Sequence, residues 1–341
     1  MKIIILIFLI FSNANSSGIE DWKEIKPGGD TSCARGTDFS FFVHPGDPSK
    51  IIIDFVGGGA CWNSETCKLG SETFTDSIEA FKKDAGSKLD GFYDKDNPQN
   101  PLRNWLHIVV PPCTGDIFVG EKDFTYKKGR KKMTIRHRGA VNVKSVLNYV
   151  REHFQNPEKI LVSGCSGGSY GSIYWTPHVK NMYPSAQVYQ FGDSGAGVIT
   201  RNFFKKHATK KWDIWKNIPG WIPGLASKPN NIVSIYKEVG DYYPDLRLSQ
   251  FNYEDDMIQQ MFYLQMGGDP FEWNPRLGSN LRRINRGIDN FNYFVAEGQD
   301  HCILPYKEFY TVEAWGVYFK NWLSDLVADR PLKNYVCPDC F

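Results

Sequence analysis

Short apolar runs that end at glycines or polar turns recur along the chain, and such runs are typical of buried strands. The clearest covers residues 50–56, where β-branched side chains precede three glycines. Polar residues hardly interrupt this run, which favours a parallel sheet that is covered on both faces. Further strands are predicted at 105–110, 159–163, 187–191, 246–251 and 293–296.

Helices are predicted between several of these strands, because apolar residues return there every three or four positions. One helix starts near Ala140 and its apolar positions extend to Phe154. Others follow Ser166 and cover residues 257–264. Strands and helices that alternate in this order predict an α/β fold with a doubly wound, mostly parallel sheet and a site at the carboxyl ends of its strands.

The N-terminus has a different pattern, an almost wholly apolar segment at residues 3–11. This segment is far shorter than the roughly 20 residues that span a bilayer, and small residues that suit signal peptidase follow it. We therefore predict a secretory signal peptide and leader at 1–17, cleaved near Ala14, followed by a single domain at 18–341. No later segment approaches membrane length, so we expect a secreted protein without stable membrane insertion.

Between about 201 and 231 the periodicity weakens, and aromatic residues stand among lysines. We interpret this segment as a helical, aromatic-rich cap insertion beside the site. Its aromatics could line an acyl or sugar pocket or could form the cap's own small core, and the sequence leaves both possibilities open. They include Phe203, Phe204, Trp212, Trp215 and Trp221.

The charge of the chain narrows the classes of partner. The 40 basic and 38 acidic residues give a formal net charge of +2, which provides no global field for nucleic acid. One basic run, residues 127–138, is interpreted as a solvated loop. We therefore expect no nucleic-acid partner.

Eight cysteines in an exported chain favour disulfides over metal sites. Cys165 and Cys302 are expected to be free, because one lies within a motif described next and the other follows a candidate catalytic histidine. Two pairs are close enough in sequence to close small loops: Cys61 with Cys67 and Cys337 with Cys340.

The string Gly164-Cys165-Ser166-Gly167-Gly168 lies between a predicted strand and a predicted helix. A strand, a sharp turn and a helix are the context of a nucleophile elbow, so Ser166 is predicted to be a catalytic nucleophile. A second glycine turn, residues 57–59, ends the first strand and could supply backbone N–H donors to the oxyanion of acyl transfer. No Lys-Ser or Lys-Thr pair follows that turn, which excludes a P-loop.

The base of such a site must follow the nucleophile along the chain. Three histidines do so: His178, His207 and His301. His178 is on the helix that leaves the elbow and is expected to point away, while His207 lies in a basic stretch of the predicted cap. His301 follows the last predicted strand in a loop that contains glycine, so we predict it as the base.

Two strand ends could supply the acid. Asp193 ends the strand after the elbow helix, and Asp255 and Asp256 follow the next strand. The carboxylate must hold His301 in the correct tautomer, so it belongs on the strand nearest the histidine loop, which favours Asp255 or Asp256. One member of that pair could instead cap the following helix.

Taken together, these motifs resemble those of the pectin acetylesterases and of the related Notum carboxylesterases. The resemblance extends through nearly the whole mature chain, and its combination of motifs is more specific than any motif alone. It implies an α/β-hydrolase fold and a serine esterase that needs neither a metal ion nor an organic cofactor. The segments that carry it are 57–63, 112–116, 164–168, 193–195 and 298–301.

The resemblance also implies roles for particular residues. In that family the acid precedes a helix in an Asp-x-x-Gln pattern, which Asp256 to Gln259 matches and Asp255 does not. Gly59 stands at a position that is often aromatic in the family, and this departure bears on the shape of the pocket. The implied oxyanion donors are Gly58, Gly59 and Gly167, and the implied disulfides are Cys33 with Cys113 and Cys61 with Cys67.

We therefore expect a secreted serine carboxylesterase that removes short acyl groups, acetyl above all, from a carbohydrate such as pectin through Ser166, His301 and Asp256. One alternative keeps this chemistry but takes a lipid ester, as in Notum, and a pocket lined by the cap aromatics would favour it. An alternative of another class is a catalytically inactive hydrolase fold that serves as a binding protein. The presence of all three triad candidates argues against that alternative.

Overall fold

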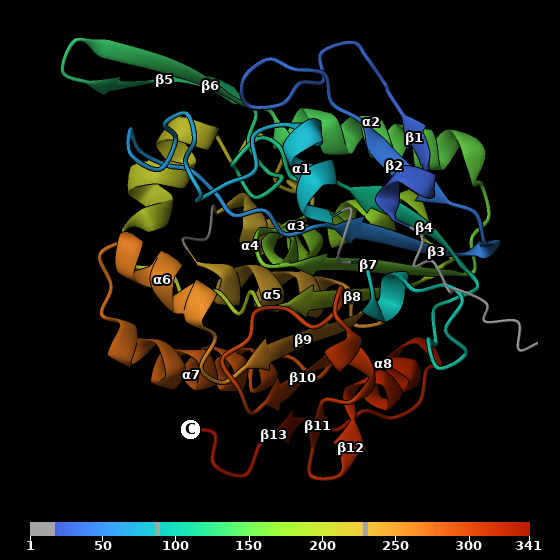
Figure 1. Ribbon diagram of the computed structural model, residues 1–341. Helices are drawn as coiled ribbons and strands as arrows, with labels where there is room; N and C mark the ends of the chain where they lie inside the picture. Colours follow the sequence, from blue (N-terminus) through green and yellow to red (C-terminus); the bar gives the residue numbers. More distant parts are fainter. Residues whose placement is uncertain (1–17, 86–88, 228–230) are drawn as a thin grey trace, which may run out of the picture.

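The computed structural model describes residues 18–85, 89–227 and 231–341, and the predicted leader at 1–17 lies outside these ranges. A nine-stranded sheet, in the order β1-β2-β4-β3-β7-β8-β9-β10-β13, forms its centre (Figure 1). Antiparallel pairing joins β1 to β2 and β2 to β4, and the other neighbours in the sheet are parallel. The strands are β1 (Lys23–Ile25), β2 (Phe41–His44), β3 (Asp47–Phe55), β4 (Trp105–Val110), β7 (Lys159–Cys165), β8 (Gln187–Asp193), β9 (Arg247–Tyr253), β10 (Phe291–Ala296) and β13 (Tyr335–Val336).

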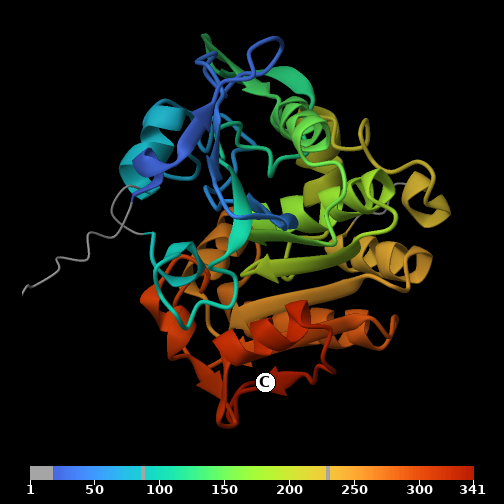
Figure 2. The ribbon, with the colours of Figure 1, turned by 90° about the vertical axis from the view of Figure 1, so that its right-hand side faces the viewer.

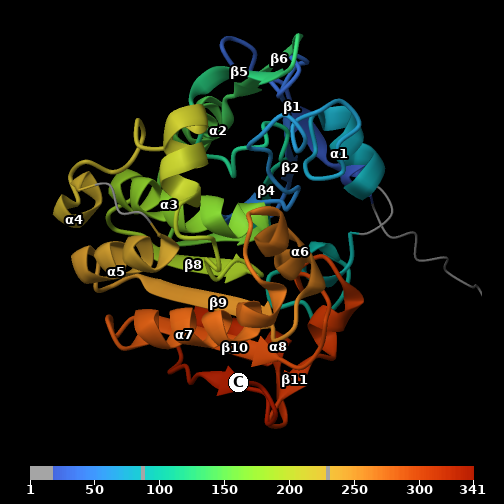
Figure 3. The same ribbon diagram turned by 90° about the vertical axis from the view of Figure 1, so that its left-hand side faces the viewer.

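Helices cover both faces of this sheet, and Figure 2 shows its early strands at one edge and its late strands at the other. In β10, Phe291 contacts Tyr236 on one face, whereas Phe294 contacts Phe319 on the other. This architecture confirms the predicted α/β fold with a doubly wound, mostly parallel sheet. One face carries α2 (Gly139–His153), α3 (Gly167–Met182), α5 (Ile232–Tyr242) and α7 (Trp273–Asn285), and the other carries α1 (Ile78–Ala85) and α8 (Phe319–Val327) (Figure 3).

The central strands are buried on both sides, as their apolar runs predict. Ile51, Ile52 and Ile53 are consecutive and fully buried, although successive side chains of a strand point to opposite faces. Each face must therefore be covered, which is the reason for the lack of alternation in this run.

Strand register brings the candidate segments to one edge of the sheet. Phe55 pairs with Gly164, so the glycine turn after β3 and the elbow after β7 are neighbours. Cys165 in turn pairs with Asp193 at the end of β8. The strands β9 and β10 end beside them, and α6 (Met257–Gln265) starts just after β9.

The interpretation of residues 127–138 as a solvated loop is wrong, because these residues belong mostly to a β-hairpin. Its strands are β5 (Lys122–Lys128) and β6 (Lys131–His137), and Figure 1 shows the hairpin projecting from the body of the molecule. One hairpin face is apolar enough to pack, since Tyr126 and Ile135 are buried. Charged residues fill most of the other positions and obscure this alternation in the sequence.

The segment predicted as a cap lies between β8 and α5. It contains the π-helix η3 (Phe204–Trp212) and the short helix α4 (Pro223–Ala226), and residues 228–230 fall outside the described ranges. None of the helices in the described ranges combines the length and apolar character that a membrane span requires. The remaining short elements are η1 (Ile19–Asp21), η2 (Gly91–Tyr93), η4 (Pro270–Glu272), η5 (Lys307–Tyr310), β11 (Glu313–Ala314) and β12 (Val317–Tyr318).

Four disulfides connect the eight cysteines. The pairs Cys33–Cys113, Cys61–Cys67 and Cys337–Cys340 agree with the sequence-based expectations. The expectation that Cys165 and Cys302 are free is wrong, because these two residues form the fourth disulfide. The physical reason lies in the arrangement of the candidate site.

Candidate active site

Ser166 lies at the sharp turn between β7 and α3. Its backbone has φ 56° and ψ −120°, and a positive φ is uncommon for a residue other than glycine. Strain of this kind costs about 1–3 kcal/mol and tends to occur at active sites. A Cβ on Gly168 would lie only 1.8 Å from the carbonyl oxygen of Phe55, so α3 can approach β3 this closely only with glycine there.

The glycine turn after β3 lies against this elbow. A Cβ on Gly57 would lie 3.2 Å from Cβ of Ser166, and a Cβ on Gly167 would lie 3.1 Å from the carbonyl oxygen of Gly59. Gly59 and Gly167 also border the same pocket as Ser166. The backbones of two predicted oxyanion donors are therefore neighbours at the serine, and Gly58 adjoins them in the chain.

His301 and Asp256 form a direct pair. Nδ1 of His301 lies 2.8 Å from one carboxylate oxygen of Asp256 and 3.0 Å from the other. An ionised carboxylate can only accept, so Nδ1 carries the proton and Nε2 is left to accept a proton from a substrate or a serine. Asp256 is fully buried, and Gln259 donates to its carboxylate from both the backbone and the side-chain amide, each at 2.9 Å.

The other two acid candidates have different partners. The Asp255 carboxylate accepts from the side-chain amides of Gln260 at 2.6 Å and Gln299 at 3.0 Å. Asp193 accepts from two backbone N–H groups described next. Of the three, Asp256 is the one hydrogen-bonded to His301, and it is also the N-cap of α6.

The turn at Asp193 and Ser194 connects the elbow to the histidine loop. The backbone carbonyl of Asp193 accepts from the N–H of Ser166 at 2.8 Å. Its carboxylate accepts from the backbone of Ile303 at 2.8 Å and of Leu304 at 2.9 Å, and burial raises the pKa of Asp193 to about 7. The Ser194 hydroxyl accepts from the N–H of the residue after His301 at 2.9 Å. One turn therefore contacts the segments of both Ser166 and His301.

The disulfide between Cys165 and Cys302 adds a covalent link between the same two segments. A ring nitrogen of His301 and the two sulfur atoms lie within 4.8 Å of one another. Because the turn at Asp193 holds the elbow and the histidine loop together, the cysteines that flank Ser166 and His301 are brought within bonding distance. This proximity depends on tertiary contacts that the separate motifs do not reveal.

Three groups of His, Cys and Glu residues in the described ranges are compact enough to hold a metal ion. Each group contains a disulfide, and a disulfide sulfur is not the thiolate that binds metals. The donor chemistry therefore does not suit a metal site at any of them. The groups are Cys61, Cys67 and His137; Cys165, His301 and Cys302; and Glu254, Cys337 and Cys340.

A pocket opens at Ser166, and most of its wall is apolar. Of the cap aromatics, Phe203 and Trp212 line this pocket, whereas Phe204 stacks on Trp215 and Trp221 contacts His178. Some of the aromatics in the segment predicted as a cap therefore line the pocket, and others pack against residues outside it. The other apolar lining residues are Ala60, Trp62, Ile117, Val198, Ile199, Phe262 and Met266.

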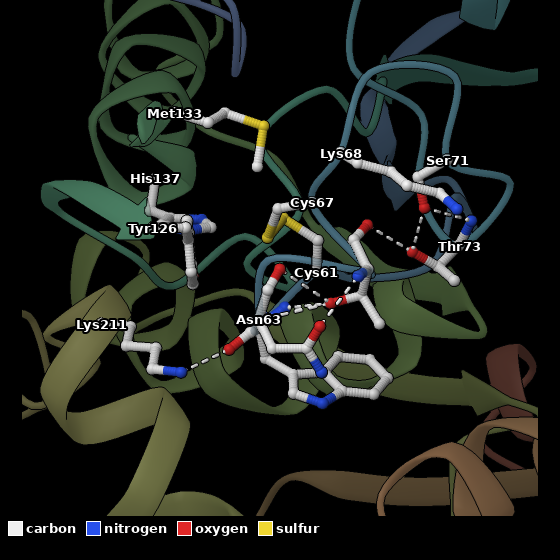
Figure 4. Close-up of a disulfide and its surroundings, with 12 residues drawn as sticks. Cys61, Asn63, Cys67, Lys68, Ser71, Thr73, Tyr126, Met133, His137 and Lys211 are labelled. Atoms are coloured by element: carbon white, nitrogen blue, oxygen red, sulfur yellow. Dashed lines mark hydrogen bonds between the residues drawn. A yellow bond between two sulfur atoms is a disulfide. The ribbon is translucent and has the colours of Figure 1, made fainter. Parts of the chain in front are cut away.

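The ring closed by Cys61 and Cys67 borders this pocket, and Figure 4 shows it beside Lys211 of the cap. Nζ of Lys211 donates to the carbonyl of Trp62 at 2.6 Å, and the indole N–H of Trp212 donates to the carbonyl of Cys61 at 3.1 Å. The segment predicted as a cap therefore holds, through Lys211 and Trp212, the residues that directly follow the glycine turn.

The two other histidines after Ser166 have other partners. Nε2 of His178 lies 3.0 Å from the carbonyl of Asn217, and Nδ1 of His207 lies 3.1 Å from Lys211. In the described part of the chain, neither histidine forms a hydrogen bond with any of the three acid candidates. His301 is therefore the histidine that the fold brings to a carboxylate beside the elbow.

Sequence reasoning missed much of the pocket wall. Tyr170, Val198, Ile199 and Met266 line it, but in the sequence they are ordinary residues of helices and loops. The hydrogen bonds from Gln259 to Asp256 could have been predicted from the sequence. The Asp-x-x-Gln spacing places the backbone and side chain of Gln259 over an N-cap carboxylate.

A nucleophile elbow, a glycine turn and a histidine loop at one edge of a mostly parallel sheet are the features of an α/β-hydrolase. The structure is similar to two crystal forms of the Wnt deacylase Notum from Drosophila, with TM-scores of 0.64 and 0.66. Sequence identity is 15% and 14%, and each comparison covers 94% of this chain and 97% of the other. This likeness concerns the fold.

The family follows from the sequence itself. The family model described as Pectinacetylesterase matches residues 25–218, which is more than half of the chain. The chain therefore belongs to the pectinacetylesterase family and is a carboxylic ester hydrolase.

Proposed function

We propose that this chain is a secreted serine esterase that removes short acyl groups, acetyl above all, from a carbohydrate such as pectin. The observation that carries the proposal is the pair of His301 and the buried Asp256, held beside the elbow of Ser166 by the turn at Asp193. The family match supports ester hydrolysis, and the eight paired cysteines support an oxidising, extracellular location.

In this mechanism Oγ of Ser166 attacks the ester carbonyl while Nε2 of His301 takes the hydroxyl proton. The negative charge moves to the carbonyl oxygen, where the N–H groups of Gly58, Gly59 and Gly167 stabilise it. His301 then returns the proton to the departing alcohol, and the acyl group stays on Ser166. A water molecule, deprotonated by His301, attacks the acyl-enzyme and releases the acid. Asp256 orients His301 and stabilises the imidazolium throughout.

A second substrate class has its own support. Phe203 and Trp212 of the proposed cap lie in the pocket wall together with Phe262 and Met266, so the wall is suited to an apolar acyl chain. A lipid ester would use more of this surface than acetate does. The chemistry at Ser166 would be the same for both substrates.

Labelling with a fluorophosphonate, followed by a panel of esters, tests the proposal. We expect stoichiometric labelling of the parent chain and none of a Ser166→Ala variant. The panel pairs aryl esters of increasing acyl length with an acetylated polysaccharide. Preference for acetyl and release of acetate from the polysaccharide would support the first substrate class, and a steady gain in kcat/KM with chain length would favour the lipid ester. Failure to label at all would instead support a binding protein without catalytic activity.

A further inference from the structure

The tip of the β5–β6 hairpin is unusually basic for this chain. Five of the six residues from 127 to 132 are Lys or Arg, although the whole chain has a formal net charge of only +2. Their side chains are exposed. Of these five residues, only Lys128 has an ion pair within the described ranges, with Glu65 at 2.5 Å. The five residues, here called the basic tip, are Lys127, Lys128, Arg130, Lys131 and Lys132.

The register of the hairpin sets these charges against one another. Lys127 is directly opposite Lys132, and Lys128 is directly opposite Lys131. Like charges in directly opposed positions destabilise a β-ladder. Two such pairs in succession therefore weaken the hairpin, so the stability of the fold does not account for the basic tip.

The base of the hairpin is firmly anchored, so the tip is not a loose tail. Tyr126 and Ile135 belong to a buried cluster with Cys61, Cys67 and Phe74. Figure 4 shows the hairpin side chains around the disulfide that these two cysteines form. The hairpin and the ring that follows the glycine turn therefore share one small core.

A second basic element continues from the hairpin toward the pocket. Nζ of Lys122 in β5 donates to the carbonyl of Lys210 in η3 at 2.9 Å, so the two elements lie side by side. Lys205, Lys206 and Lys210 of η3 are exposed and have no ion pair with an acidic residue in the described part of the chain. Phe203 and Trp212, which flank this row of lysines, line the pocket at Ser166. Basic side chains therefore stand at the hairpin tip, at Lys122 on the opposite end of β5, and along η3 beside the pocket.

From this arrangement we propose that the basic tip and the η3 lysines form a binding site for an anionic polysaccharide, which positions an ester on the same polymer at Ser166. Each hairpin strand rises about 3.3 Å per residue, so Lys122 to Lys128 spans about 20 Å. The ligand is therefore a chain several sugars long. The choice of a carbohydrate rests on the proposed function, whereas the negative charge of the ligand follows from the basic surface itself.

The outer face of the hairpin favours a polysaccharide over two other polyanions. Thr125 and Thr134 lie between the Lys127–Lys132 pair and the Asp123–Arg136 pair, with their hydroxyls 2.8 Å apart. That face carries no aromatic residue on which a single-stranded base could stack, and the tip carries no apolar side chain to insert into a bilayer. Hydroxyls and charges without stacking surfaces suit a chain of acidic sugars.

The test uses the full chain and a de-esterified polyuronate as the probe. A quadruple variant replaces Lys127, Arg130, Lys131 and Lys132 with Gln. We expect it to bind the polyuronate about tenfold or more weakly at low salt, because an attractive field raises local ligand concentration by about that factor. The difference should shrink at high salt, where screening shortens the range of the field. A matched control replaces Arg103, Arg283, Arg286 and Lys333, exposed residues that lie outside the hairpin and the cap, and it should bind as the parent chain does.

Equal binding of the polyuronate by the quadruple variant and the parent would overturn the proposal. Tighter binding of duplex DNA or of anionic vesicles would overturn the choice of a polysaccharide, and so would equal binding of a neutral polysaccharide. Acetate release from an acetylated polyuronate is measured separately, and there the variant should raise KM and keep kcat. Salt-dependent binding without acetate release would leave the basic site standing and reject the proposed esterase function.

Discussion

Cys165, the residue before Ser166, forms a disulfide with Cys302, the residue after His301. The two cysteines are 137 residues apart, and a loop of that length lowers the entropy of the unfolded chain by an amount equivalent to about 5 kcal/mol. The same bond restrains the position of the histidine loop against the elbow. It therefore connects the stability of the fold with the geometry of the site.

Replacement of both Cys165 and Cys302 by Ser should lower kcat more than it raises KM. A looser histidine loop weakens proton transfer in the transition state and leaves the pocket wall in place. Kinetics with an aryl acetate check this. They are measured below the melting temperature of the variant, which the loss of the disulfide lowers. The matched control replaces Cys337 and Cys340 by Ser. It removes a disulfide that closes only a short ring at the C-terminus. An unchanged kcat in the first variant would contradict the positioning role of the disulfide.

Replacement of Ser166 by Ala should abolish turnover of an aryl acetate and leave the protein folded. Loss of a triad member typically costs several orders of magnitude in rate. The backbone strain at φ 56° remains in the variant, because alanine also carries a Cβ, so we expect little change in stability. Rates and thermal melting are measured on the same preparation. More than about a tenth of the parent rate would refute the nucleophile assignment.

Asp256→Asn should lose roughly 10⁴ in kcat, because an amide can donate to Nδ1 of His301 and so stabilise the wrong tautomer. Asp255→Asn is the matched control, since that carboxylate bonds Gln260 and Gln299 instead. We expect it to remain close to the parent in kcat. Steady-state kinetics on both variants decide, and collapse of the Asp255 variant alone would move the acid to that residue.

Removal of the ring that Cys61 closes with Cys67 should also reduce kcat. The ring and its contacts with Lys211 and Trp212 fix the segment after Gly59. A misplaced oxyanion donor loses most of its effect on the transition state, and one donor is worth about 10²–10³ in kcat. A double Ser variant of Cys61 and Cys67 tests this with an aryl acetate. A large rise in KM at constant kcat would show instead that the turn shapes the substrate pocket.

Asp54→Asn should stabilise the protein at pH 7 and have little effect near pH 4. Burial raises the pKa of Asp54 to about 6, and its carboxylate accepts from Tyr93 and Ser163. The unfolded chain releases this proton near pH 4 and the native state near pH 6, so the free energy of unfolding falls as pH rises through that window. The two units correspond to about 3 kcal/mol. Buried His107 nearby stays neutral, because burial holds its pKa well below the usual value.

Denaturant unfolding of parent and Asp54→Asn, at pH 4.5 and at pH 7, isolates this contribution from the other buried acids. Burial likewise raises the pKa of Asp116 to about 6, and both proteins retain that group. If parent and variant differ in stability by the same amount at the two pH values, the native carboxyl of Asp54 is already ionised at pH 4.5, as in the unfolded chain, and its pKa is not raised.

The sequence predicts the parts of this molecule in which local pattern and tertiary role agree. The isoleucines of β3 are buried on both faces because the strand is central, and the same fact makes their run continuous. The glycines of the elbow reflect a contact with β3 that no side chain permits. Both signals are short in range and can be read from a single segment.

Other features depend on pieces that meet only in space. Cys165 and Cys302 pair because the turn at Asp193 holds two distant loops together, and neither cysteine has a neighbour in sequence that reveals this. The hairpin is hidden for a different reason. Basic residues dominate its composition, and its three buried positions, Tyr126, Ile135 and His137, are too few for a clear alternation.

The helix α6 begins at the carboxylate of Asp256, which caps its first turn and also bonds His301. Further along, Phe262 of the same helix and its C-cap residue Met266 form part of the pocket wall. The start of α6 is therefore held at His301, whereas its far end borders the pocket at Ser166. We therefore expect substitutions at Phe262 and Met266 to change which ester is accepted, and substitutions at Asp256 to change the rate. On this expectation, selectivity and rate depend on opposite ends of one helix.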